Sequence, residues 1–217
     1  MITLHHAPQT RSMRTLWLLY ELQVEFKLVK HAFGKNLRDP DYLKKSIAGR
    51  VPALEIDGMA LVESGAMTEV LCERFPHSDL GRGFDDPERA MWLQWVHFAE
   101  TVSQHAAALT QQHVVLYDDA MRSPVVMKIE AKRSEKCYEA LETVLTKQDH
   151  LLRAFSAADV SVGQAIYMAR HFAPIEAYSG LKAWYTRITA RPAFRKSLPG
   201  REDRLYTQDF YPAWAMT

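Results

Sequence analysis

The stretch that decides the fold is residues 50–64, which read RVPALEIDGMALVES. Two short apolar runs flank Asp57-Gly58, a residue pair typical of the two-residue turn of a β-hairpin. Ser64 stands where a hydroxyl residue commonly caps a helix, and the residues behind it follow a helical pattern. The stretch therefore predicts two antiparallel strands, residues 53–56 and 59–62, that lead directly into a helix.

The residues before this stretch alternate between strand and helix patterns. Residues 2–5 and 26–29 are predicted strands, and residues 11–22 between them place apolar side chains on one helical face. A strand–helix–strand unit of this kind forms a parallel pair with a right-handed crossover. The chain is therefore expected to begin with a small α/β domain, in which an irregular or helical segment precedes the hairpin.

The residues after the hairpin change character. Residues 76–88 are rich in turn-forming residues and predict a linker. Beyond them the patterns are almost all helical. Ser123-Pro124 has the form of an N-cap and a first helical residue, and SAAD at residues 156–159 has the form of a capping box with Asp in place of Glu. The sequence thus predicts an all-helical second domain.

Composition narrows the possible functions. The chain has 217 residues, enough for two small domains, and its 27 basic and 26 acidic residues do not favour a nucleic-acid or anionic-membrane partner. No apolar run is long enough to span a bilayer, and the first residues lack a secretory pattern, so a cytoplasmic protein is expected. Cys72 and Cys137 are expected to be reduced structural thiols, and the nine histidines show no metal-ligand spacing, so no metal is expected. A small-molecule site is the natural remaining function.

Two pairs in the deciding stretch have the chemistry of a peptide site. A cis bond between Val51 and Pro52 would turn the Val51 N–H and C=O outward, where they could pair with the backbone of a short peptide. A trans proline that begins a strand explains the same residues. Ser64 at a helix N-terminus would suit a carboxylate, and Glu63 beside it would suit an ammonium group. The alternative is a simple helix cap next to a solvated Glu63.

The turn between the first strand and the first helix, QTRSMR at residues 9–14, carries the hydroxyls of Thr10 and Ser12. A hydroxyl that donates to a thiolate lowers the pKa of the thiol. A shift of two units requires about 2.7 kcal/mol, and one hydrogen bond to a charged acceptor supplies about 1.5–3 kcal/mol. One hydroxyl therefore suffices for most of the shift. The alternative is that Thr10 and Ser12 only cap the helix.

Taken together, these motifs resemble the cytosolic glutathione transferase family. The resemblance extends over residues 2–198 and rests on two separated sets of motifs in the family's order. The matching segments are VPAL at 51–54, Asp57-Gly58, Leu61, Glu63-Ser64, FSAAD at 155–159, Trp184-Tyr185 and RPAF at 191–194. It implies a thioredoxin-like, glutathione-binding domain over residues 1–76, a linker over 77–87, and an all-helical domain over 88–217 that forms the pocket for an electrophile.

The resemblance also implies roles for particular residues. Val51, before a cis Pro52, would pair by its backbone with the cysteinyl part of glutathione, and Glu63 and Ser64 would hold the γ-glutamyl end. Arg50 stands where many members have a basic residue near the glycyl carboxylate. The family's Asn-Pro pair before this run is missing, and the chain has SIAG at residues 46–49.

The activating turn is similar to that of serine-type members, of the kind found in bacteria and fungi. Thr10 falls at the expected serine, and Ser12 is the fallback. The turn contains no tyrosine or cysteine, so it does not resemble the tyrosine-type or cysteine-type classes.

The implied function is conjugation of the glutathione thiolate to an apolar electrophile, as in detoxification, by a cytoplasmic homodimer. Glutathione is the cosubstrate, and no metal or other cofactor is implied. Alternatives are a glutathione-dependent peroxidase, isomerase or dehalogenase on the same site, or a non-catalytic binding or adaptor protein. The aromatic tail, residues 206–214, is expected to pack on the helical domain or to fold over the pocket.

Overall fold

The computed structural model describes residues 1–212, with the side chains of residues 35 and 36 left aside. It begins with a four-stranded sheet in the order β2-β1-β3-β4. The strands are β1 (Ile2–His6), β2 (Phe26–Lys30), β3 (Ala53–Ile56) and β4 (Met59–Leu61). β1 and β2 are parallel, whereas β1 pairs with β3, and β3 with β4, in antiparallel register. The predicted β-α-β unit followed by a hairpin is confirmed.

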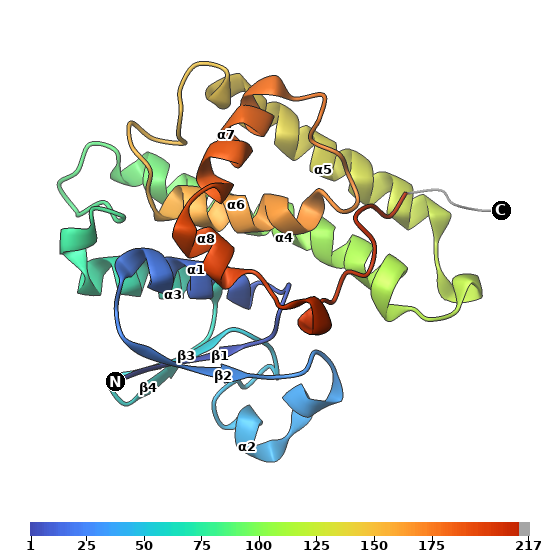
Figure 1. Cartoon of the computed structure of the whole chain (residues 1–217), viewed down its shortest axis with the longest axis horizontal. Helices are drawn as coiled ribbons and strands as arrows, with labels where there is room; N and C mark the ends of the chain where they lie inside the picture. The colour runs from blue at the N-terminus through green and yellow to red at the C-terminus, as the bar shows by residue number, and fades with distance from the viewer. Residues whose placement is uncertain (213–217) are drawn as a thin grey trace.

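The two faces of this sheet are covered differently. Helices α1 (Ser12–Leu22) and α3 (Ser64–Arg74) lie between the sheet and the rest of the molecule, as Figure 1 shows. The short helix α2 (Pro40–Leu43), preceded by the 3₁₀ turn η1 (Lys35–Arg38), lies on the opposite side of the sheet. This arrangement turns the start of α1 and the start of α3 toward the helical part of the chain.

The hairpin turn has the backbone that its sequence predicts. Asp57 and Gly58 both have positive φ, 52° and 79°, as a primed turn with right-handed strand twist requires. The predicted cap behind it is wrong. Ser64 is the first residue of α3, the N-cap position is held by Glu63 with φ 70°, and no side-chain cap bond forms there among the described residues.

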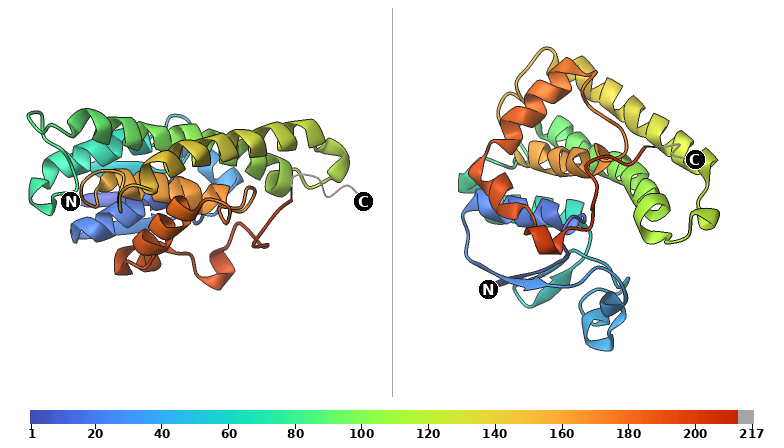
Figure 2. Two further views of the ribbon diagram at one scale, coloured as in Figure 1. Left: turned by 90° about the horizontal axis from the view of Figure 1, so that it is seen from above. Right: turned by 45° about the vertical axis from the view of Figure 1, so that its right-hand side comes forward.

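The second part of the chain is helical. Its main helices are α4 (Arg89–Thr110), which continues into a π turn, η3 (Gln111–Val115), then α5 (Pro124–Leu145), α6 (Ala157–Ala169), α7 (Ser179–Thr189) and α8 (Pro192–Ser197). Short 3₁₀ turns lie at η2 (Pro76–Ser78), η4 (Asp119–Met121) and η5 (Arg201–Asp203). Helices α4 and α5 run side by side along the molecule (Figure 2), and α6 packs against α4. The predicted caps at Ser123 and at the Ser156–Asp159 box are both confirmed.

Helix α6 is the centre of the second part, since all of its residues are buried. It also approaches α1 closely. A Cβ atom on Gly163 would lie 2.5 Å from Ile188 Cδ1 and 3.0 Å from the Trp17 ring. The ring of Trp17 in turn packs edge-on against Phe194 at 4.8 Å between centroids. The two parts of the chain therefore share one hydrophobic core.

The segment after α8 returns along the helical part. Tyr206 and Tyr211 are buried and pack against Phe172, whereas Phe210 is exposed. This agrees with the expected packing of the aromatic tail, although Ala213 and Trp214 lie outside the described residues. Within residues 1–212, none of the helices combines the length and apolar character that crossing a membrane requires.

Candidate functional site

The turn after β1 holds the two hydroxyls that the sequence singled out. Thr10 Oγ1 donates to the Ala7 carbonyl at 2.7 Å and lies 2.7 Å from Ser12 Oγ. Thr10 is 7% exposed, whereas Ser12 is fully buried. Ser12 Oγ accepts from Ala7 N at 3.1 Å and lies 2.7 Å from Nδ1 of His6. Of the two hydroxyls, Thr10 is the one that a ligand at the surface can meet.

Hydrogen bonds from the second part of the chain hold the turn that contains Gln9 and Thr10. Gln9, with φ 52°, donates from Nε2 to Tyr167 Oη at 2.8 Å and accepts from the backbone N–H of Tyr206 at 2.9 Å. Gln164 on α6 donates to the Thr10 carbonyl at 3.2 Å. The conformation of the turn therefore depends on α6 and on the segment after α8.

The Val51–Pro52 peptide bond is cis, as the resemblance implies. The loop before it is anchored by Ser46, whose hydroxyl donates to the Arg50 carbonyl at 2.8 Å and accepts from the Arg50 N–H at 3.1 Å. The Tyr42 hydroxyl donates to the same carbonyl at 2.7 Å. This is how the chain holds the loop without the family's Asn-Pro pair. The Arg50 side chain is exposed.

Ser64 is held by a buried arginine. Arg14 on α1 donates from Nη1 to Ser64 Oγ at 2.8 Å and to Glu100 Oε1 at 2.6 Å, and from Nη2 to Ser103 Oγ at 3.0 Å. Arg14 is fully buried, and burial lowers the pKa of its guanidinium against the pull of Glu100. Burial acts to raise the pKa of Glu100, but the charges of Arg14 and Arg11 outweigh it and hold that pKa below its usual value. Helices α1, α3 and α4 thus meet at one ion pair.

The three segments gather at one end of the sheet. His5 of β1 pairs with Ala53 of β3, which places Pro52 beside the end of β1 where the Thr10 turn begins. Arg14, one turn into α1, reaches the start of α3 at Ser64. Thr10, Val51 and Ser64 are therefore brought to the same region, and Glu63 lies exposed beside it.

Comparison with known proteins decides the family. Residues 1–71 match the model of the glutathione S-transferase N-terminal domain. Glutathione S-transferase F13 of Arabidopsis thaliana is 30% identical over 86% of this chain and 90% of its own length. Glutathione S-transferase 3 of Schizosaccharomyces pombe is 26% identical over 95% of this chain and 90% of its own length.

The chain belongs to the glutathione S-transferase family.

Solved structures agree with this assignment. Glutathione transferase F7 from Populus trichocarpa is 25% identical and superposes with a TM-score of 0.80 over 91% of this chain and 97% of its own. The expected fold, a thioredoxin-like domain followed by a helical domain, is confirmed, and so is the expectation of a glutathione transferase enzyme. One relative, 26% identical over 91% of this chain and 94% of its own length, is the disulfide-bond oxidoreductase YfcG of Escherichia coli, so the family alone does not fix the reaction.

Several residues around this glutathione S-transferase site were missed from the sequence. Arg14 was given no role, although a charged residue on the buried face of an apolar helix is a signal that it has a partner. Its partner Glu100 is 86 positions away, beyond the reach of a local pattern. His6 was set aside with the other histidines as lacking metal spacing, and its contact with Ser12 appears only in three dimensions.

The protein's own cysteines lie apart from these residues. Cys72 and Cys137 are free and buried, on α3 and α5. Burial raises the pKa of the Cys72 thiol to about 12, so this thiol stays protonated at neutral pH. Within residues 1–212, no group of three histidine, cysteine or acidic side chains is arranged to hold a metal ion.

Proposed function

We propose that this protein binds glutathione at the end of the sheet beside Thr10 and conjugates the glutathione thiolate to an apolar electrophile. The observation that carries the proposal is the Thr10 hydroxyl, which lies just before α1, at the end of the sheet where the cis Pro52 loop also lies, and is less buried than Ser12. The remaining steps follow from what each group can donate or accept.

Thr10 would activate the thiol. Its hydroxyl already donates a short hydrogen bond in the turn, and donation to a thiolate instead would be charge-assisted. Such a bond contributes about 1.5–3 kcal/mol, which lowers the pKa of the thiol by about 1–2 units. More of the glutathione is then in the nucleophilic form at neutral pH.

Ser64 would bind the γ-glutamyl carboxylate. Because Arg14 can only donate, Ser64 Oγ must accept from it, and the Ser64 hydroxyl proton, which otherwise makes a long 3.5 Å hydrogen bond to Glu100 Oε1, can be donated to a ligand instead. A carboxylate beside Ser64 would take that proton and the first free N–H groups of α3. Glu63, exposed next to it, would accept from the γ-glutamyl amine.

The cysteinyl and glycyl parts of glutathione would lie along the cis-proline loop. The Val51 backbone would pair with the cysteinyl part in the manner of an added strand. Arg50, exposed on the same loop, would meet the glycyl carboxylate.

The remaining assignments are part of the same proposal. Residues 1–76 would form the glutathione-binding domain, residues 77–87 the linker, and residues 88–217 the domain that shapes the electrophile pocket. The enzyme would act as a cytoplasmic homodimer in detoxification, with glutathione as cosubstrate and without a metal. Solved relatives from a sphingomonad and from Phanerochaete chrysosporium hold glutathione and oxidised glutathione, which supports the choice of ligand.

The test is a titration of the glutathione complex, following the ultraviolet absorbance of the thiolate as pH rises. We expect Thr10→Ala to raise the pKa of the bound thiol by about 1–2 units and to lower kcat with a model aryl halide, with glutathione affinity within a few-fold. Thr10→Ser is the matched control and should retain the low pKa. Binding without a lowered pKa would point to a glutathione-binding protein with other chemistry, and no binding would favour the adaptor alternative.

A further inference from the structure

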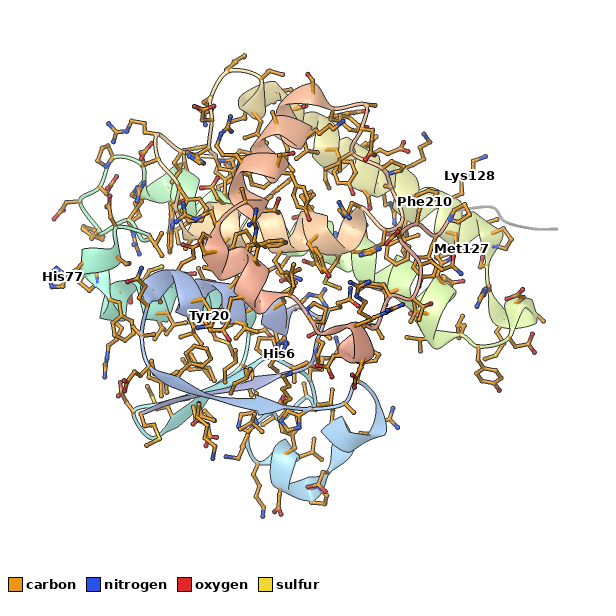
Figure 3. The ribbon with its side chains drawn as sticks, in the orientation of Figure 1. His6, Tyr20, His77, Met127, Lys128 and Phe210 are labelled. Carbon is orange, nitrogen blue, oxygen red and sulfur yellow. The ribbon has the colours of Figure 1, made fainter. Side chains whose placement is uncertain are left out.

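A buried imidazole lies directly behind the Thr10 turn. His6 is the last residue of β1 and is 3% exposed. Its position, near the end of the sheet and below α1, is labelled in Figure 3. From its Nδ1 atom, two steps of 2.7 Å lead outward, first to Ser12 Oγ and then to Thr10 Oγ1. This makes a continuous chain of three polar groups from the interior to the candidate thiol site.

The direction of this chain follows from counting protons on Ser12. Its hydroxyl has one proton to donate and can accept two hydrogen bonds. Ala7 N–H takes one of the acceptor positions at 3.1 Å. The other is open either to His6 Nδ1 or to the Thr10 hydroxyl, which both lie 2.7 Å away.

The two choices have opposite consequences for Thr10. If His6 Nδ1 carries no proton, Ser12 donates to it, and the remaining acceptor position of Ser12 draws the Thr10 proton inward. If Nδ1 carries a proton, His6 donates to Ser12, and both acceptor positions are filled. Ser12 then donates to Thr10 Oγ1 or to the Ala7 carbonyl at 3.0 Å, and the Thr10 proton cannot turn toward Ser12. Its remaining acceptors are the Ala7 carbonyl at 2.7 Å and a bound thiolate, and the charged thiolate is the stronger of the two.

The charge state of His6 is set by its surroundings. Burial, helped by the charges of Lys30 and His31, lowers the pKa of His6 to about 4, against the opposing effects of Ser12 and Asp203. The imidazole is therefore neutral at neutral pH and carries one proton, on Nδ1 or on Nε2. Which nitrogen holds it is decided by the hydrogen bonds that each atom makes.

We propose that His6 is a positioning residue that, as the Nδ1–H tautomer, donates to Ser12 and thereby turns the Thr10 proton outward to the thiolate of bound glutathione. The inference rests on the proposed function of Thr10. No proton leaves the chain, because only the two hydroxyls rotate. Each donor in the chain polarises the next, so the hydrogen bonds from His6 and Ser12 strengthen the hydrogen bond from Thr10 to the sulfur.

The first experiment compares two substitutions of His6 in the thiol titration of the glutathione complex. His6→Asn can place an amide N–H near the position of Nδ1, whereas His6→Leu has no donor. We expect His6→Leu to reduce the thiolate fraction of bound glutathione about tenfold at neutral pH, which is one pKa unit. His6→Asn should restore most of the wild-type value, and both should bind glutathione within a few-fold of wild type. An equal loss in both variants would overturn the proposal, because it would reflect packing rather than donation.

The second experiment needs no substitution. The ¹⁵N resonances of the His6 ring in the wild-type glutathione complex distinguish the two tautomers, and we expect the proton on Nδ1. A proton on Nε2 would overturn the proposal even if His6→Leu failed to fold.

Thr10→Ala in the same titration separates this proposal from the one it rests on. If Thr10→Ala leaves the thiol pKa unchanged, Thr10 is not the activator and both proposals fail. If Thr10→Ala raises the pKa while His6→Leu does not, only the role of His6 fails.

Discussion

Helices α1 and α6 begin with the same kinds of residue and use them differently. At α6, the Ser156 hydroxyl accepts from Ala158 N–H, and the Asp159 carboxylate accepts from Ser156 N–H, so the cap closes on itself. At α1, the N-cap position is Arg11 in a helical conformation, without a side-chain cap bond among the described residues. The Ser12 N–H donates to Thr10 Oγ1 at 3.2 Å, and the hydroxyls of Thr10 and Ser12 also bond to each other and to Ala7, but no carboxylate takes part in these bonds.

This difference distinguishes the start of α6, which serves stability, from the start of α1, which we propose meets a ligand. The positive end of α6 is already neutralised by a carboxylate that is fully buried. The first turn of α1 contains no acidic residue, and Thr10 before it is 7% exposed. The comparison teaches that a hydroxyl before a helix is a functional candidate when no carboxylate caps the same helix start and part of the hydroxyl residue stays exposed.

The largest expected effect is at the closed cap. Asp159 accepts from Leu151 N–H at 3.0 Å, from Trp184 Nε1 at 2.8 Å and from Ser156 N–H at 2.9 Å. In Asp159→Asn, an amide NH₂ would face one of these donors, so we expect a loss of about 3–5 kcal/mol in the free energy of unfolding. Urea denaturation of the variant and of wild type measures this loss. The thiol pKa of bound glutathione should stay unchanged, and a shift would show that the two helix starts are not independent.

The next largest effect is a pH dependence of the free energy of unfolding that comes from His6, which lies behind the start of α1. His6 has a pKa of about 4 in the folded protein, below its ordinary value of 6.5. Between these values the unfolded chain binds the proton and the folded chain does not, so stability falls as pH is lowered from 6.5 to 4. From pH 7 to pH 4.5 this group costs about 2 kcal/mol.

The matched control for this pH effect is His6→Asn, because asparagine does not titrate. Urea unfolding of both proteins at the two pH values isolates the contribution of His6 from that of other histidines. Equal losses in the two proteins would contradict a lowered pKa for His6.

A smaller effect tests the comparison directly. Ser156→Ala should cost about 1–2 kcal/mol of stability, as expected for the loss of a helix cap, and leave glutathione chemistry intact. Thr10→Ala should show the reverse pattern, with a raised thiol pKa as its main effect. Thermal unfolding gives the stability of each variant, and thiol titration gives the pKa of the glutathione thiol bound to each. A thiol pKa that moves in Ser156→Ala would break the distinction between the two helix starts.

The smallest effect is at the other end of α1. Gln23 ends the helix in the left-handed region with φ 55°, where glycine has no Cβ penalty. Gln23→Gly should therefore raise stability by about 0.5–1 kcal/mol without a change in the thiol pKa. Thermal unfolding of this variant and of wild type measures the gain. A loss of stability would mean that the glutamine side chain makes a contact worth more than the backbone strain.

Much of the fold was predictable because its signals are local. Asp57-Gly58 fixes the hairpin, and the Ser156–Asp159 box and Ser123 each fix the start of a helix, within a few residues of sequence. The prediction for Ser64 was wrong for the opposite reason. Its hydroxyl is taken by Arg14, which is 50 positions away in the sequence, so a local capping rule could not assign its partner.

The candidate site was predictable in outline through the resemblance to a family, but its network was not. The Arg14–Glu100 pair joins α1 to α4, and the His6–Ser12 contact depends on how the turn folds back on β1. Buried polar groups choose partners by satisfying all of their donors and acceptors at once. That condition is set by the packed structure. The roles of Thr10, Arg50, Val51, Pro52, Glu63 and Ser64 toward glutathione stay predictions.

The hydrogen bonds of Gln9 limit how this protein can be recombined with its relatives. A chimera that keeps the first 76 residues and replaces the rest would lose Tyr167, the Tyr206 backbone and Gln164, the partners that hold the Gln9–Thr10 turn. The Thr10 hydroxyl lies in the first part of the chain, but the turn that places it is held by hydrogen bonds from the second part. A chimera of this protein should therefore keep α6 and the C-terminal segment together with the turn that they support.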